Sequence, residues 1–304
     1  MMLVVLVLTA LALYFAQRNV AVTAERDLRE NFQAEISSLH KVQALRHAAL
    51  TERCRELVLK PRLHAALEDN ALDLLYPTAK DELRDLMEDA VRRAEGANSL
   101  QAGFYRFLDS LGAIIPPPNP TEVGKLSKEA EAQLTLKTLP ETQQIGYVLE
   151  TAHTLDGTMN EVMAVPILST ETGEVISALV VGFKPYEVVD KHEGTGLKSG
   201  IWVNGRLHLP SLPKSAKLKI ENDIAQAVSK ADGAQNSFNV TVDGVPQLLF
   251  YKPLNPGSLF PPAYEICVYS LANSIVQHDL AGIKALTRDE LINLFTLSTD
   301  EPSA

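Results

Sequence analysis

The run MMLVVLVLTALALYFA, residues 1–16, opens the chain and meets no charged side chain before Arg18. It leads into a polar stretch where apolar residues recur every three or four positions, as they do on one face of an α-helix. These residues form an apolar seam: Leu28, Phe32, Ile36, Leu39 and Val42. Neither Pro nor Gly interrupts before Pro61, so one long helix is predicted. Its polar part, about forty residues, would reach roughly 60 Å.

The apolar start is interpreted as a membrane anchor over residues 1–19, although sixteen apolar residues fall short of the roughly 17–25 of a typical span. A signal peptide cleaved after Val22-Thr23-Ala24 and a buried core helix are the alternatives. The basic residues that follow the run would favour an inside location for the bulk, but long domains cross largely regardless of charge. We therefore expect a single-pass inner or plasma membrane protein with its bulk in the periplasm.

Composition excludes some classes of protein. The formal net charge of −10 argues against a nucleic-acid surface, which needs clustered Lys and Arg. The two cysteines, Cys54 and Cys267, are compatible either with one bridge in an oxidising compartment or with two buried thiols.

After the long helix the chain stays helical and then changes to strands. A helix is predicted to open at Pro61, and another over 78–95. From Gly103 the pattern is strand, turn, strand, helix and three further strands, and from Gly200 the same order repeats. The first set is 104–108, 113–115, helix 127–138, 145–150, 161–168 and 175–183. The second set is 200–203, 206–209, helix 216–231, 237–242, 245–254 and 264–271.

Catalytic signatures are missing from the sequence: it contains no Gly-x-Ser-x-Gly, His-Glu-x-x-His or Cys-x-x-Cys. His40 and His47 lie seven residues apart, whereas two ligands on one helix usually sit at i and i+4. We expect no enzyme activity, no cofactor and no metal site.

A small-molecule site is predicted in the first strand set. Aromatic side chains with a few converging polar groups are what such a site needs, and alternation along the strand from 104 places Tyr105, Phe107 and Asp109 on one face. The candidate ligand-binding residues are Tyr105, Phe107, Asp109, Tyr147, Met163 and His153. The simpler interpretation is that the aromatics are sheet core, that Asp109 forms a turn, and that Trp202 is core of the second set.

The layout resembles the double Cache domains, the PAS-like extracytoplasmic sensor modules of bacterial receptors. Three local stretches are similar to the family: FLDSLG at 107–112, VPI at 165–167 with ALVVG at 178–182, and KPL at 252–254 with YSL at 269–271. The resemblance covers roughly residues 20–285. It implies an α+β fold, with a long N-terminal helix followed by two PAS-like lobes, each a five-stranded antiparallel sheet with a helix.

The expected domain boundaries follow from this resemblance. They are a membrane anchor at 1–19, a stalk helix and helical segment at 20–98, a distal lobe at 99–190, a proximal lobe at 191–285 and a tail at 286–304. Amino-acid-binding members carry an Arg-x-Trp-Tyr type signature that is absent here, so no amino acid is inferred.

The resemblance also implies function: an unknown small molecule is sensed outside the membrane, and the signal passes through helices to an output partner or a missing cytoplasmic domain. Residues 272–297 are too charged for the second span that such receptors carry. The chain is therefore expected to be a truncated receptor or to work through a partner. A homodimer through the stalk helix is expected. The alternatives are a structural dimerisation module that pairs through the apolar seam and a secreted periplasmic binding protein.

Overall fold

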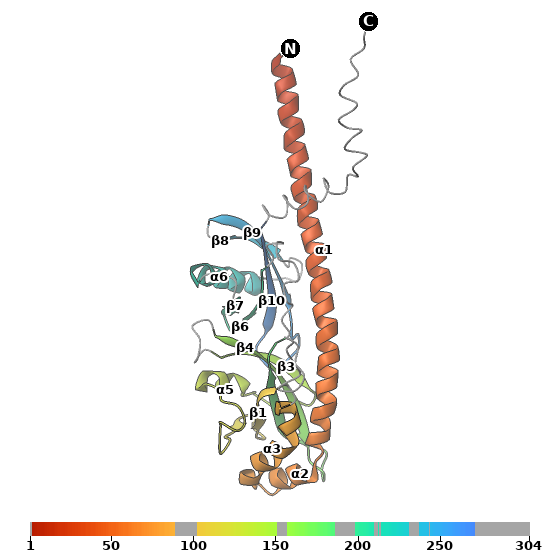
Figure 1. The fold of residues 1–304 in the computed structure, drawn as a ribbon, viewed down its shortest axis with the longest axis vertical. Coiled ribbons are helices and arrows are strands. Elements are labelled where there is room, and N and C mark those ends of the chain that lie inside the picture. Colours follow the sequence, from red (N-terminus) through yellow and green to blue (C-terminus); the bar gives the residue numbers. More distant parts are fainter. Residues whose placement is uncertain are drawn as a thin grey trace.

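A computed structural model of the chain describes residues 2–88, 102–150, 157–185, 198–209, 212, 214–230, 237–242 and 244–270. The first helix, α1, runs unbroken from Met2–Val58. Figure 1 shows α1 as a rod with two sheets stacked along it, and its N-terminal end projects beyond both. The predicted long helix is thus confirmed, and both sheets pack against it.

Two shorter helices lie at the far end of the rod (Figure 1). The first is α2, Pro61–Glu68, with Pro61 in its first turn as expected. The second is α3, Leu72–Glu88, which carries Pro77 in its interior. The sequence-based start at Thr78 was therefore wrong by six residues, and the predicted end at Glu95 lies outside the described residues.

The distal sheet has five antiparallel strands in the order β2-β1-β5-β4-β3. Its elements are β1 (Ala102–Leu108), β2 (Ile114–Ile115), α5 (Lys128–Leu134), β3 (Gln144–Glu150), β4 (Thr158–Leu168) and β5 (Val175–Phe183). The predicted helix 127–138 is shorter than expected and ends at Leu134. One face of the sheet packs on α1, α2 and α3, and the other packs on α5.

The proximal sheet repeats this order strand for strand, as β7-β6-β10-β9-β8. Its elements are β6 (Lys198–Val203), β7 (Arg206–His208), α6 (Lys214–Lys230), β8 (Ser237–Val242), β9 (Val245–Pro253) and β10 (Ala263–Ser270). The predicted hairpin turn at Asn204-Gly205 is confirmed, with both residues at positive φ. The predicted α+β fold, two equivalent five-stranded lobes on one long helix, is therefore what the structure shows.

The apolar seam of α1 is buried within its own chain. Leu28, Phe32, Ile36 and Leu39 form one hydrophobic cluster with Leu248, Phe250, Cys267 and Tyr269 of the proximal sheet. Alternate residues of the same strands pack on α6 from the opposite face. The hypothesis that this seam pairs two helices of different chains is corrected accordingly: the proximal sheet covers it.

The cysteines belong to different clusters. Cys54 is buried with the distal core and Cys267 with the seam, and both are thiols. Of the two interpretations left open by the sequence, the structure has the two buried thiols. Within the described residues, no helix combines the length and the hydropathy that a membrane crossing requires.

Candidate functional site

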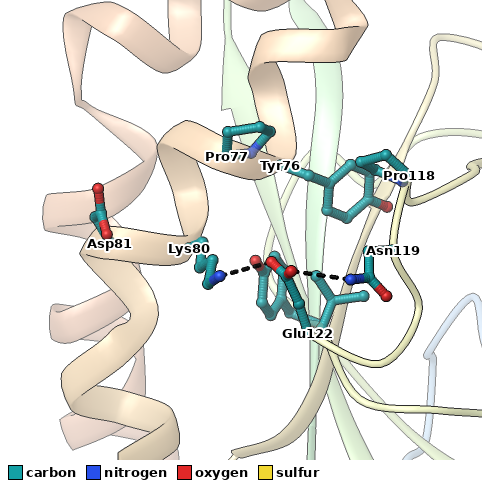
Figure 2. A pocket seen from close by; sticks show the side chains of 9 residues that line it. Tyr76, Pro77, Lys80, Asp81, Pro118, Asn119 and Glu122 are labelled. Carbon is teal, nitrogen blue, oxygen red and sulfur yellow. Dashed lines mark hydrogen bonds and ion pairs between the residues drawn. The ribbon is translucent and has the colours of Figure 1, made fainter.

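A pocket opens in the distal lobe between α3, β1 and the proline-rich loop 116–123. Its cavity volume is about 300 Å³, at the lower end of the range of small-molecule sites. The lining residues are Tyr76, Pro77, Lys80, Asp81, Tyr105, Pro118, Asn119, Glu122 and Val123. Figure 2 shows Tyr76 and Lys80 of α3 beside Pro118, Asn119 and Glu122 of the loop, whereas the side chain of Asp81 points away from the loop.

Tyr76 fixes α3 against the edge of the sheet. Its hydroxyl donates to the carbonyl of Ile115 at 2.6 Å and accepts from the backbone N–H of Phe107 at 3.2 Å. Burial raises the pKa of Tyr76 to about 12, so the phenol remains a donor at any physiological pH. The next residue, Pro77, offers no N–H to the helix, and the two hydrogen bonds of Tyr76 hold this turn in place.

The rim of the pocket is bridged by charge. Lys80 Nζ lies 2.6 Å from Glu122 Oε2, and Asn119 Nδ2 donates to Glu122 Oε1 at 2.9 Å (Figure 2). The hydrogen bond from Lys80 lowers the pKa of Glu122 below its usual value. The two ionic side chains are 53% and 44% exposed, so the pair contributes little stability. The pair connects α3 to the loop, and breaking it to open the pocket costs little free energy.

Tyr105 forms the inner part of the lining and differs from the rim. The residue is 1% exposed, and its hydroxyl has no hydrogen-bond partner in the part of the chain that the structure describes. Burial raises the pKa of this phenol, with the neighbouring Tyr76 as the next cause. Within the described residues it is the only buried side-chain nitrogen or oxygen of the pocket lining that lacks a partner. A buried, unsatisfied donor costs free energy unless something accepts from it.

Arg106, the next residue on β1, faces the other side of the sheet and positions the loop. Its guanidinium donates to Glu131 Oε1 at 2.9 and 2.7 Å. It also donates to the carbonyls of Val123 at 3.2 Å and Gly124 at 2.9 Å. The fully buried Arg106 thus connects α5 to the end of the loop that carries Glu122.

The structure places four of the six predicted site residues on the same sheet face. The register aligns Tyr105 with Val181 and Met163 across β1, β5 and β4, and Tyr147 with Glu161 on β3 and β4. Only Tyr105 reaches the pocket. Phe107 and Met163 are buried in the distal core.

The remaining predicted residues lie elsewhere. Tyr147 packs at the contact between the lobes and bonds to α1 through Gln43. Asp109 follows β1 and accepts from the backbone N–H groups of Leu111 and Ala113, at 2.8 and 2.9 Å, as a turn residue does. His153 lies outside the described residues.

Sequence reasoning missed the α3 and loop side of the pocket, namely Tyr76, Lys80, Asp81, Asn119 and Glu122. The available signals were indirect. The run PPPNP at 116–120 indicates a surface loop, because prolines interrupt regular structure. The spacing of the apolar residues Leu83, Leu86, Met87 and Ala90 indicates a helix with a buried face. Nothing in either pattern indicated that the two meet over Tyr105.

Comparison with known proteins concerns the fold. No protein-family model and no curated protein matches the chain. Among solved structures, the chain is similar to the ligand-binding domain of the Pseudomonas fluorescens chemoreceptor CtaA, which was solved with L-serine. The TM-score is 0.42 and the identity 12%, over 80% of this chain and 98% of that one. It is also similar to the periplasmic sensory domain of the Campylobacter jejuni chemoreceptor Tlp1, with a TM-score of 0.36 and 12% identity, over 78% and 95% of the two chains.

The architecture agrees with the one that the resemblance to double Cache domains implied. Two sheets with the same 2-1-5-4-3 strand order lie in series along one N-terminal helix, which is the layout that the sequence resemblance predicted.

Proposed function

We propose that this chain is an extracytoplasmic sensor domain that binds a small molecule in the pocket of its distal lobe. The observation that carries the proposal is the Tyr105 hydroxyl, which is buried at the pocket and has no acceptor among the described residues. A ligand that accepts from this phenol would remove the cost of the unsatisfied group. Phe107, Met163 and Tyr147, which were expected to bind the ligand, are proposed to act indirectly. They lie on the same sheet face as Tyr105 and do not line the pocket.

The size and charge of the pocket limit the ligand. A volume of about 300 Å³ suits a metabolite rather than a peptide. The lining offers one ammonium, Lys80, two carboxylates, Asp81 and Glu122, and one amide, Asn119. Polar molecules of either sign are therefore candidates.

The test is a thermal-shift screen of the full chain with a panel of L-amino acids, polyamines and two- to six-carbon carboxylic acids. A compound that binds the folded chain raises its apparent stability by RT ln(1 + [L]/Kd), about 2.7 kcal/mol at a hundredfold excess over Kd. Tyr105→Phe removes only the unpartnered hydroxyl and should weaken binding about tenfold or more. Tyr251→Phe, a buried tyrosine of the proximal lobe, is the matched control and should leave the shift unchanged. A shift that is equal in the wild type and in Tyr105→Phe would place the site elsewhere.

Membrane attachment belongs to the same proposal. The N-terminal part of α1 projects beyond both sheets (Figure 1), and five large apolar side chains whose exposure the structure describes are exposed there. The exposed ones are Val7, Leu8, Leu11, Tyr14 and Phe15. We infer that residues 1–19 tether the sensor to the inner membrane with its bulk in the periplasm. Flotation of the full chain with liposomes, compared with a chain that starts at residue 20, tests this.

A homodimer through α1 is proposed on the face that the lobes leave open, since the apolar seam is already covered. That face carries Leu45, which is 74% exposed. Sedimentation of Leu45→Asp beside the wild type tests the pairing. Unchanged self-association in Leu45→Asp would mean that the dimer does not form through this face. A signal would leave through α1 to an output partner or a cytoplasmic domain.

A further inference from the structure

A buried polar cluster joins α1 to the distal sheet, away from the pocket. Its centre is Glu161 of β4, which is 1% exposed. Glu161 Oε1 accepts from the Tyr147 hydroxyl at 3.2 Å and lies 3.0 Å from His47 Nε2. The guanidinium of Arg46 lies 3.4 Å from Glu161 Oε2. We call these four residues, together with Gln43, the Glu161 cluster.

The cluster has further connections on both sides. Arg46 donates to the carbonyl of Lys184 at 2.6 Å and stands over the ring of Phe183, with its Cζ 5.8 Å from the centroid. Gln43 donates to the Tyr147 hydroxyl at 3.2 Å. Residues 43–47 of α1, just over one helical turn, are therefore fixed to β3, β4 and the end of β5 by directional bonds.

The position of this cluster along α1 is informative. Residues 28–39 of the helix make apolar contacts with the proximal sheet, and residues 50–58 make apolar contacts with α2, α3 and the distal core. Apolar contacts are not directional and tolerate small sliding movements. Hydrogen bonds weaken steeply with misalignment, and a shift by one residue moves the helix about 1.5 Å. The register of α1 is therefore defined most sharply at the cluster.

The cluster also adjoins the sheet row that leads to the pocket. Met163 lies two residues beyond Glu161 on the same face of β4, and it aligns through Val181 with Tyr105. On its other side Met163 contacts α1, where Thr51 Oγ1 lies 3.9 Å from its sulfur. A displacement of β1 at Tyr105 would thus be passed across one row of packed side chains to the strand that carries Glu161.

We propose that the Glu161 cluster is the latch that sets the register of α1 against the distal sheet, and that it couples this register to the pocket. The regulatory meaning rests on the proposed sensor function. Ligand in the pocket shifts the balance between a latched and a released position of α1, and α1 extends past the proximal lobe toward its N-terminal end. A ligand can shift this balance only by binding the two positions with different affinity.

Amide hydrogen exchange of the full chain tests the latch without any ligand. Glu161→Gln keeps the size of the side chain and removes its charge. Exchange at residues 40–51 should rise about tenfold, which corresponds to roughly 1.4 kcal/mol in the local opening equilibrium. Exchange at the pocket segments, 76–83 and 116–123, should change with it. Tyr147→Phe removes one bond to Glu161, should give the same pattern at smaller size, and is measured in case Glu161→Gln does not fold.

Two control variants separate coupling from general loosening. Leu39→Ala weakens α1 at the proximal sheet and should leave exchange at 116–123 unchanged, and Glu30→Gln alters only a surface pair. The inference is overturned if Glu161→Gln leaves both pocket segments unchanged, or if Leu39→Ala changes them equally. These outcomes are independent of the thermal-shift screen. If a compound binds but Glu161→Gln does not change exchange at the pocket segments, the latch is refuted and the sensor function is not. If exchange at these segments changes but no compound binds, the result counts against the sensor function and not against the latch.

Discussion

Phe32 of α1 stacks on Phe250 of β9, with ring centroids 5.1 Å apart and ring planes 23° apart. Both residues are fully buried in the cluster that the helix shares with the proximal sheet. Truncation of a buried Phe leaves a cavity, so Phe32→Ala should lower the free energy of unfolding by about 3–5 kcal/mol. Urea denaturation of the full chain measures this. Gln33→Ala, at an exposed position of the same helix, should change it by about 0.5 kcal/mol at most.

Removal of the Arg106 guanidinium should be costly. Arg106→Met takes the guanidinium donor from the Glu131 carboxylate and the Gly124 carbonyl, and it leaves the Val123 carbonyl with only the backbone N–H of Tyr105. Breaking one side of a buried ion pair destabilises a protein by about 3–5 kcal/mol, and Glu131 is partly exposed, so the lower end of that range is expected in urea denaturation. Because Arg106 also positions the loop of Glu122, any compound found in the screen should bind Arg106→Met more weakly. Arg26→Met, a change at an exposed pair, should affect neither quantity.

His40 should make stability depend on pH. Burial and the nearby charge of Lys252 hold the pKa of His40 below the ordinary value of 6.5. As pH falls below about 6.5, His40 binds a proton in the unfolded chain but stays neutral in the folded chain. Stability therefore decreases with falling pH in the window between the ordinary and the lowered pKa. Thermal unfolding of the wild type and His40→Gln at pH 7.5 and 5.5 should show a smaller loss in the variant. An equal loss in both would mean that other groups cause the pH dependence.

Gly146 of β3 makes room for a residue of the other lobe. A Cβ added at this position would overlap the ring of Phe260. Gly146→Ala should lower the free energy of unfolding by about 1–3 kcal/mol through overpacking. Gly103→Ala is the matched control, because a Cβ there meets nothing closer than an ordinary contact. Calorimetry of both variants decides the matter: similar melting temperatures would mean that the ring moves aside without cost.

The doubled strand order was readable from the sequence because its signals are local. Period-two alternation marks the strands, and turn glycines separate them, as at Asn204-Gly205. The start of α3 was not readable, since proline is disfavoured inside a helix and Pro77 lies inside this one. There the burial of Leu75 and Ala79 and the two bonds of Tyr76 outweigh the missing N–H. Tertiary contacts of this kind leave no periodic pattern in the sequence.

For the candidate site too, residues with a local sequence signal were predicted, and residues that meet only through tertiary contacts were not. Tyr105 was predicted because the alternation of side chains along a strand assigns this aromatic residue to one face of the sheet. The pocket lies on the same face. Lys80 and Glu122 are hydrophilic residues on a helix surface and in a loop, and such residues usually point to solvent. Their meeting depends on how α3 docks. The apolar seam was likewise predicted to be buried, but a stripe of apolar side chains does not say which surface covers it.

Phe260 comes from the loop between β9 and β10, yet its ring belongs to the hydrophobic cluster of the distal lobe. Around it, Ser258 Oγ donates to the carbonyl of Ile145 at 2.6 Å, and the Leu259 N–H donates to Gln144 Oε1 at 3.1 Å. The proximal lobe therefore completes the interior of its neighbour. A chimera that exchanges one lobe for that of another protein would need to keep residues 255–260 together with the distal half, or the distal core would lose the ring of Phe260 and contain a cavity.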